Sequence, residues 1–227
     1  MKAAVYAGTR NLYSDMTTAA KSLAMHSNVD VVYFLIEDSK FPERLPDYVQ
    51  CLDVSGQKYF SKNSPNIYKL WTWMVLMRAA LPKIFPELDR ILSLDVDTIV
   101  NYNIDELWDL PLGDVYLAGV LEPLKSVRSS IYVNMGVAMF NLEKLRNDRM
   151  DDKIIRSLNR DRFRFAEQDC INLLCQRSIL TIPSTYNANR FTEPCEDPKI
   201  IHFAAESDWK KLPIVQSYKV LSWDEIR

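Results

Sequence analysis

The arrangement of short apolar runs is the feature that most constrains how this chain can fold. Residues 31–36 read VVYFLI, an unbroken run typical of a strand buried on both faces of a parallel sheet. A shorter run at 3–7 precedes it. Between the two lies a helical pattern, with an expected N-cap at Ser14 and an apolar face formed by Met16, Ala19, Ala20 and Leu23. Strand, helix and strand in this order predict an α/β fold with a mainly parallel central sheet flanked by helices.

The rest of the chain repeats this alternation. We expect further strands at 48–54, 90–94, 115–120, within 131–142, at 179–182 and at 200–203. We expect helices at 67–81 (ended by Pro82), 150–158 and 168–176, a short helix within 103–114, and an exposed loop at 55–66. At 227 residues, these elements predict a single domain over 1–227.

Composition excludes several classes of protein. Apolar residues make up 48% of the chain, which is enough for a sizeable core, and the formal net charge of −2 argues against broad nucleic-acid binding. The four cysteines lie at irregular spacings that suggest free thiols in a reducing compartment. No signal peptide is evident, because the apolar run at the start is too short for a signal core and no typical cleavage pattern follows it. No transmembrane segment is evident, because the most apolar stretch, LWTWMVLMRAALP, is broken by Arg78 and Pro82. We therefore expect a cytoplasmic protein, with peripheral membrane contact left open.

Two aspartates end the strand predicted at 90–94. The sequence ILSLDVDTIVN places Asp95 and Asp97 just past the apolar run, where ligands bind in open α/β sheets. Carboxylates there suit a hard divalent cation such as Mn²⁺ or Mg²⁺. The alternative without a metal is that the two aspartates only stabilise a turn, since Asp readily hydrogen-bonds nearby backbone N–H groups.

Two kinds of chemistry would use such a pair. In a haloacid dehalogenase-type phosphatase, Asp95 would be the nucleophile and Asp97 the acid/base. That motif normally opens its domain, however, and the only Asp–Asp pair in the second half, Asp151–Asp152, follows no apolar strand. In a nucleotide-sugar glycosyltransferase, the aspartates would instead hold a cation that neutralises the charge growing on the departing diphosphate.

Five segments favour the second chemistry, because in order and spacing the chain resembles the retaining glycosyltransferases of family 8. That family includes lipopolysaccharide galactosyltransferases and glycogenin. The segments are LDRILSLDVDTIVNYNIDELWDL, YVNMGVAMFNL, EQDCINLL, YNANRF and KIIHFAAESDW. They lie between residues 88 and 209, and with the N-terminal segment YAGTRNLY the resemblance extends over nearly the whole chain. The resemblance implies a GT-A fold, a UDP-sugar donor (UDP-glucose or UDP-galactose), Mn²⁺ or Mg²⁺ as cofactor, and a glycan, lipid-linked or protein acceptor.

The resemblance also assigns site residues. Asp95, Asp97 and His202 would be the metal ligands. The donor would contact residues from five segments, namely Ala7, Thr9, Asn11, Tyr13, Arg78, Asp95, Val96, Asp97, Glu122, Asn134 and Gly136. Gln168 would face the anomeric carbon, with Glu167 and Asp169 beside it. Because an amide is a poor nucleophile, a front-face displacement is favoured, and Glu167 is the residue to suspect if a carboxylate attacks.

Departures from the family pattern lie at the C-terminal end. The family glycine after HF is Ala205, and its Lys-Pro-Trp is replaced by SDW, so Lys210 or Lys211 would have to supply the lysine that holds the diphosphate. This motivates a third hypothesis, a non-catalytic UDP-sugar-binding protein. The acceptor is not specified, because we expect its contacts in variable loops such as 55–66 and 122–130.

Overall fold

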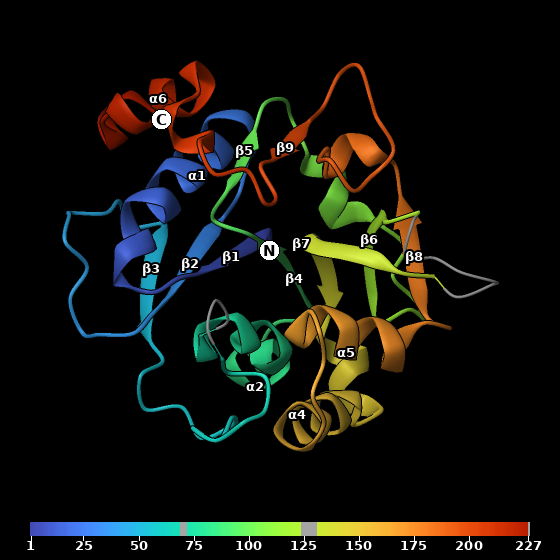
Figure 1. Cartoon of the computed structure of the whole chain (residues 1–227). Coiled ribbons are helices and arrows are strands. Elements are labelled where there is room, and N and C mark those ends of the chain that lie inside the picture. The colour runs from blue at the N-terminus through green and yellow to red at the C-terminus, as the bar shows by residue number, and fades with distance from the viewer. Residues whose placement is uncertain (69–71, 124–130, 227) are drawn as a thin grey trace.

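A computed structural model describes residues 1–68, 72–123 and 131–226, and its architecture is a twisted sheet with helices on both faces (Figure 1). The strands are β1 (Ala3–Ala7), β2 (Val31–Ile36), β3 (Val49–Asp53), β4 (Arg90–Leu94), β5 (Thr98–Val100), β6 (Leu117–Leu121), β7 (Val133–Asn141), β8 (Ile179–Ile182) and β9 (Ile200–His202). The helices are α1 (Tyr13–His26), α2 (Leu81–Ile84), α3 (Leu142–Asn147), α4 (Met150–Arg160), α5 (Ala166–Cys175) and α6 (Pro213–Val220). Short 3₁₀ helices include Trp73–Ala80, Asp105–Asp109 and Trp209–Lys211.

The main sheet has seven strands in the order β3-β2-β1-β4-β7-β6-β8. Four of its six strand pairs are parallel, which confirms the prediction of a mainly parallel sheet, and β7 runs antiparallel to both β4 and β6. Strands from both halves of the sequence thus meet in one sheet. The extent of the domain, predicted as 1–227, stays a prediction.

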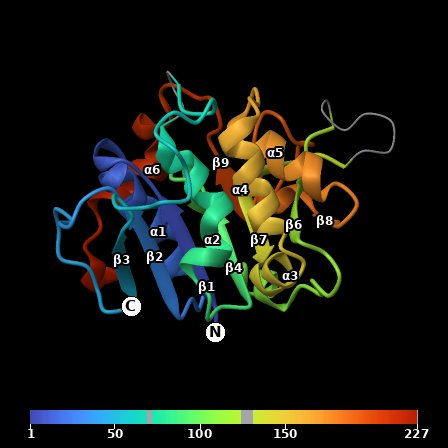
Figure 2. The ribbon, with the colours of Figure 1, turned by 90° about the horizontal axis from the view of Figure 1, so that it is seen from below.

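Alternating side chains give the sheet two separate hydrophobic cores. On one face, Val5, Leu35 and Ile91 pack with residues of α2, α4 and α5. On the other, Tyr6, Phe34 and Leu92 pack with α1. Figure 2 shows α2, α3 and α4 in front of the sheet from below, with α1 behind it. Burial on both faces explains why β1 and β2 are continuously apolar in sequence.

A second, two-stranded sheet positions the C-terminal segment beside the end of β4. In it, β5 pairs antiparallel with β9, so that Thr98 lies opposite His202. Phe203, Trp209 and Val215 form a small third core beneath α6. The sequence did not predict β5, because three residues that follow a turn are too short for a strand pattern to emerge.

Three local expectations were wrong. Pro82 does not end a helix but lies in the first turn of α2, where its missing N–H costs nothing, and part of the helix expected at 67–81 lies outside the described residues. Ser14 lies inside α1 rather than capping it. The loop at 55–66 is not simply exposed, since Phe60 and Asn66 are buried. The Asn66 side chain fixes this loop by donating to the carbonyls of Leu158 and Asp161, at 2.7 and 2.8 Å.

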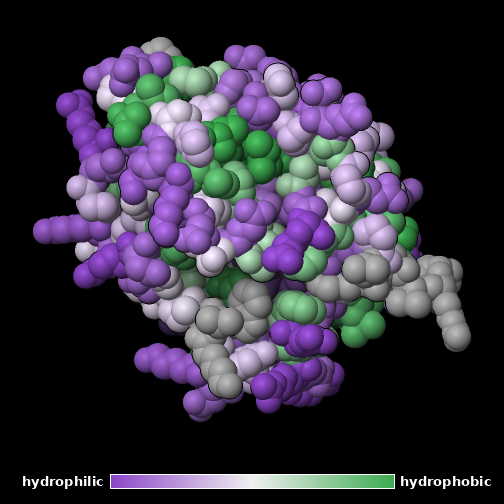
Figure 3. Space-filling view, turned by 45° about the horizontal axis from the view of Figure 1, so that its top comes forward, coloured by the Kyte–Doolittle hydropathy of each residue, from purple (hydrophilic) through white to green (hydrophobic). Residues whose placement is uncertain are grey.

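Among the described residues, every helix is too short or too polar to cross a bilayer. Hydrophilic residues cover most of the face shown in Figure 3, and hydrophobic ones form smaller patches between them.

Candidate functional site

Asp95, Asp97 and His202 meet where β4 ends. The Asp95 N–H donates to the carbonyl of Gly136 at 2.8 Å, which fixes the turn that follows β4. The Phe203 N–H donates to the carbonyl of Asp97 at 2.9 Å, and the pairing of β5 with β9 brings His202 alongside. One ligand atom from each of the three side chains lies within 4.8 Å of the other two. The structure thus brings together the three residues for which the sequence predicted a metal-binding role.

The electrostatics of this triad match a cation site. His202 Nε2 lies 3.4 Å from Asp97 Oδ1 and 3.7 Å from Asp95 Oδ2, and only 4% of the His202 side chain is exposed. Burial alone would lower the pKa of His202, but its hydrogen bond to Asp97 and the charges of Asp97 and Asp95 raise it. Burial alone would raise the pKa of Asp97, but the interaction with His202 lowers it. A bound cation would compete with protonation of these groups.

The donor set of the triad fits Mn²⁺ or Mg²⁺. It offers carboxylate oxygens and one imidazole nitrogen, and both aspartates line a cavity with room for further oxygen ligands. The other ring nitrogen, His202 Nδ1, lies 2.9 Å from the side-chain oxygen of Asn187. Nε2 is therefore the nitrogen that faces the two carboxylates.

Gly136, on β7, provides the surface against which the His202 ring lies. A Cβ atom at this position would lie 2.1 Å from His202 Cε1 and 2.5 Å from Nδ1, far inside contact distance. The assignment of Gly136 to the donor sugar stays a prediction, and in the structure its missing side chain makes room for the His202 ring. Any larger residue would displace the ring.

Arg78 connects the triad to the start of α5. Its guanidinium pairs with Asp95 on one side and with Glu167 on the other, the latter at 2.8 Å, and its Nε donates to the Ser93 hydroxyl at 3.1 Å. Burial opposes the charge on Arg78, but Asp95 and Glu167 raise its pKa overall. Burial raises the pKa of Glu167 to about 7, and Arg78 limits this rise.

A cavity of about 450 Å³ opens beside Asp95 and Asp97, within the range of small-ligand sites. Eight of the predicted site residues line it, namely Ala7, Thr9, Asn11, Arg78, Asp95, Val96, Asp97 and Lys210. The Thr9 hydroxyl donates to the Asn11 side chain at 2.6 Å, so these two form one polar wall. Apolar residues such as Val5, Leu35 and Met74 form the floor.

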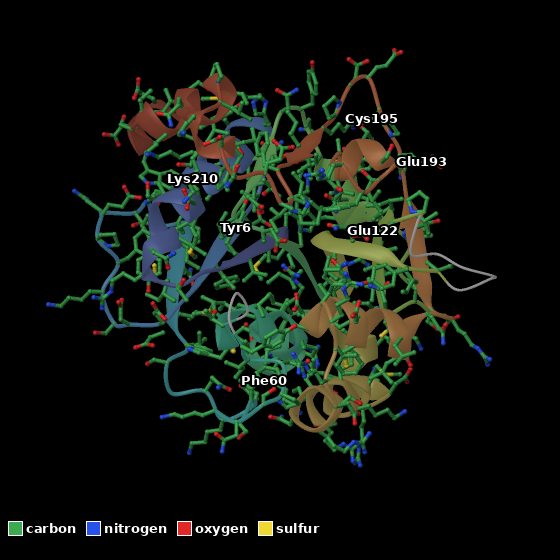
Figure 4. The ribbon with its side chains drawn as sticks, in the orientation of Figure 1. Tyr6, Phe60, Glu122, Glu193, Cys195 and Lys210 are labelled. Carbon is green, nitrogen blue, oxygen red and sulfur yellow. The ribbon has the colours of Figure 1, made fainter. Side chains whose placement is uncertain are left out.

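Tyr13 and the two candidate lysines differ in their position relative to this cavity. Tyr13 does not line this cavity, because it is the first residue of α1, is 2% exposed and stacks on Phe41 with 4.9 Å between ring centroids. Of the two candidate lysines, Lys210 lines the cavity and pairs with Asp15 of α1. Lys211 lies in solvent and pairs with Asp208 at 2.8 Å. Figure 4 shows Lys210 beside α1 and Glu122 beside β7.

The other predicted residues form a buried polar network on the β7 side of the triad. Glu122 accepts from Asn134 Nδ2 at 2.6 Å and from Gln168 Nε2 at 3.3 Å. Gln168 Oε1 accepts from the Met135 N–H at 3.0 Å. Asp169 accepts from the Tyr132 hydroxyl and from the Phe165 N–H. The predicted catalytic residues therefore lie together at the start of α5, and residues 124–130 of the predicted acceptor loop lie outside the described residues.

Sequence reasoning gave no separate role to Asn187 or to Trp209. Asn187 is fully buried and contacts the metal-ligand candidate His202, whereas Trp209 lines the cavity. The segment YNANRF carried a usable signal, because two asparagines spaced two apart in a non-helical stretch favour local polar networks.

Comparison with solved structures identifies the fold. The described structure superimposes on the glycosyltransferase GlyE from Streptococcus pneumoniae TIGR4, with a TM-score of 0.73, 22% identity, and coverage of 99% of this chain and 62% of that one. It superimposes equally well on the galactosyltransferase LgtC in complex with donor and acceptor sugar analogs, with a TM-score of 0.73, 20% identity and 98% of both chains covered. These structures are GT-A glycosyltransferases, and at such identities the likeness is one of fold.

Sequence comparison supplies the family. Residues 5–209 match Glycosyl transferase family 8, and the chain belongs to that family. Among curated proteins it is 26% identical to GlyE of Streptococcus pneumoniae serotype 4 over 198 residues, which cover 82% of this chain and 47% of GlyE. It is 29% identical to the lipopolysaccharide 1,2-glucosyltransferase of Escherichia coli K12 over 113 residues, or 44% and 33% of the two chains. The chain spans less than half the length of these relatives.

Membership of that family argues against the phosphatase alternative. The structure adds a physical reason. Asp151 and Asp152, the acidic pair that a phosphatase would need, lie in the first turn of α4 and pair with Lys83. They are held by a structural ion pair, whereas Asp95 faces His202 and Arg78.

Proposed function

We propose that this chain is a retaining glycosyltransferase that moves a hexose, glucose or galactose, from a UDP-sugar to an acceptor hydroxyl with a divalent metal on the diphosphate. The observation that carries the proposal is that Asp95, Asp97 and His202 converge at the edge of the cavity lined by Thr9, Asn11 and Lys210. A metal site next to a polar cavity suits a nucleotide diphosphate, because phosphate oxygens complete the coordination of Mn²⁺ or Mg²⁺.

The metal, when bound, would neutralise the negative charge of the departing nucleoside diphosphate. The residues themselves supply its ligands and a second cation. Lys210 reaches the cavity from the 3₁₀ helix Trp209–Lys211 and would hold a phosphate oxygen there, in place of the family lysine. Thr9 and Asn11, which also line the cavity, would contact the base or ribose. Arg78, anchored by Glu167, would orient Asp95 and contact the donor.

We propose that the glycosyl transfer is a front-face displacement. Support comes from how the three residues at the start of α5 are engaged. The Glu167 carboxylate already pairs with Arg78, and the Asp169 carboxylate accepts two hydrogen bonds. The Gln168 amide is fixed by the Met135 N–H and by Glu122, which suits a group that positions a substrate rather than one that attacks it.

The acceptor and the location remain broader proposals. The acceptor would be a glycan, a lipid-linked glycan or a protein side chain. Among the described residues, which include all four cysteines, each thiol is free, and this supports our proposal of a cytoplasmic location.

The proposal is tested by UDP release from a panel of UDP-sugars, with and without Mn²⁺. We expect slow hydrolysis of UDP-glucose or UDP-galactose that needs the metal and is lost in Asp97→Asn. Asp114→Asn is the matched control, because Asp114 is exposed and lies outside the cavity. Release that is indifferent to Mn²⁺ and to Asp97 would refute the proposal. UDP-sugar binding without turnover on any acceptor would instead establish the non-catalytic alternative.

A further inference from the structure

The hydrogen bonds around Asn187 determine which nitrogen of His202 carries a proton. Asn187 is fully buried, and its side-chain oxygen lies 2.9 Å from His202 Nδ1. An asparagine amide can face a neighbour with its oxygen or with its NH₂ group, and only the hydrogen-bond network distinguishes the two orientations. In this protein two backbone N–H groups fix the orientation independently, because a backbone N–H can only donate.

The first fixed donor is the N–H of Gly136. It donates to Asn134 Oδ1 at 2.9 Å, so the Asn134 oxygen must face this side. The same oxygen accepts from Asn187 Nδ2 at 2.9 Å, and therefore the NH₂ group of Asn187 must point toward Asn134. Asn134 Nδ2 is turned the opposite way and donates to Glu122, which agrees with this assignment.

The second fixed donor is the N–H of Phe191. It donates to Asn189 Oδ1 at 2.8 Å, which leaves the NH₂ group of Asn189 facing Asn187. Asn189 Nδ2 donates to Asn187 Oδ1 at 3.0 Å. If Asn187 were flipped, it would set two NH₂ groups against each other here and two oxygens against each other at Asn134.

Both series of hydrogen bonds, through Asn134 and through Asn189, therefore present the oxygen of Asn187 to His202. We infer that Asn187 is a positioning residue of the metal site, which holds the His202 ring with its proton on Nδ1 and its lone pair on Nε2, toward Asp95 and Asp97. An oxygen at 2.9 Å requires a donor on Nδ1. The lone pair of the neutral ring is then on the nitrogen that lies 3.4 Å from Asp97.

This arrangement has a use in metal binding. Partners of a ligating histidine fix its tautomer and ring orientation, and their loss typically lowers metal affinity by roughly 10–100-fold. Without Asn187, the neutral ring would be free to carry its proton on Nε2, where the carboxylates of Asp97 and Asp95 would accept it. A protonated Nε2 cannot bind a metal, so the site would resist loading.

The inference rests on the proposed metal site, but its first test does not need a metal. The chain has only two histidines, so protein labelled with ¹⁵N-histidine gives two imidazole spin systems. His26 is the internal reference, since its Nε2 contacts the Tyr218 hydroxyl at 2.8 Å, away from the triad. At alkaline pH, where the His202 ring is neutral, we expect the proton on Nδ1. A neutral ring protonated on Nε2 in the wild-type protein would overturn the inference.

Variants then test the role of Asn187 itself. In Asn187→Ala we expect the proton to move to Nε2 and the Mn²⁺ affinity, measured by calorimetry, to fall by roughly 10–100-fold. Asn187→Asp keeps an oxygen facing Nδ1 and should keep the wild-type tautomer. Asn66→Ala is the matched control, because Asn66 is equally buried but bonds to the end of α4, and it should change neither property. An unchanged tautomer and affinity in Asn187→Ala would refute the inference, whereas a wild-type protein that binds no Mn²⁺ would refute the proposed function instead.

Discussion

Gly136→Ala should destroy the proposed metal site by steric displacement of His202. The added Cβ would lie 2.1 Å from His202 Cε1, whereas ordinary contact begins at 3.4 Å, so the ring would have to retreat by about 1.3 Å. The ring cannot retreat easily, because Nδ1 is bonded to Asn187 and the His202 N–H donates to the carbonyl of Ala188 at 2.9 Å. Metal–ligand distances tolerate only about 0.2 Å, so His202 would no longer coordinate.

The expected magnitude is a loss of Mn²⁺ affinity of at least roughly 10–100-fold, because a first ligand is lost rather than one of its supports. Overpacking should also lower the free energy of unfolding by about 1–3 kcal/mol. Calorimetric Mn²⁺ titration measures the first effect, and urea denaturation measures the second.

Gly56→Ala is the matched control for this variant, since a Cβ at Gly56 meets nothing within 4 Å. Gly56→Ala should leave both the Mn²⁺ affinity and the free energy of unfolding unchanged. Wild-type Mn²⁺ affinity in folded Gly136→Ala would refute the reasoning, because it would mean that His202 is not a ligand or that the ring moves freely.

Three further predictions follow from contacts in the site. Lys210→Met should weaken UDP binding by about tenfold, the equivalent of one charge-assisted bond of roughly 1.4 kcal/mol, whereas Lys211→Met should not; equal effects would contradict the assignment of Lys210. Arg78→Met should lower the free energy of unfolding by roughly 3 kcal/mol, because it leaves Asp95 and buried Glu167 unpaired. Adding Glu167→Gln to this variant should restore part of the loss, and strictly additive effects of the two substitutions in urea denaturation would refute this coupling. The raised pKa of His202 predicts that protein stability and Mn²⁺ affinity change in opposite directions as pH rises through that pKa, above 6.5. The metal-free protein should lose the stability of the His202–Asp97 pair, whereas its Mn²⁺ affinity should increase. Thermal melting and calorimetry measure the two trends, and trends in the same direction would contradict this prediction.

The parts of the fold that could be predicted from sequence are those set by local patterning. The strand β4 and the position of Asp95 and Asp97 follow from an apolar run that ends in two carboxylates, and the structure has β4 at the predicted residues. By contrast, β5 is only three residues long, and the position of Pro82 in the first turn of α2 depends on a preceding 3₁₀ helix that has no sequence signature.

The candidate site likewise combines features that follow from local sequence with features that depend on tertiary contacts. His202 could be assigned to the triad only through the family resemblance, because its approach to Asp97 depends on β5–β9 pairing across about half of the chain. The contact between Gly136 and the His202 ring is a tertiary packing relation that no spacing encodes. Ala205 gives a related example. It adopts a positive φ of 60°, and this conformation explains why a glycine suits the position where the family pattern has one.

The central claim is that Asp95, Asp97 and His202 hold a divalent metal against a nucleoside diphosphate, and the most direct measurement is UDP binding by calorimetry with and without Mn²⁺. We predict that wild-type protein and Asp114→Asn bind UDP more tightly when Mn²⁺ is present. In Asp97→Asn this enhancement should disappear, while the protein remains folded. UDP binding by Asp97→Asn with the wild-type dependence on Mn²⁺ would contradict the account.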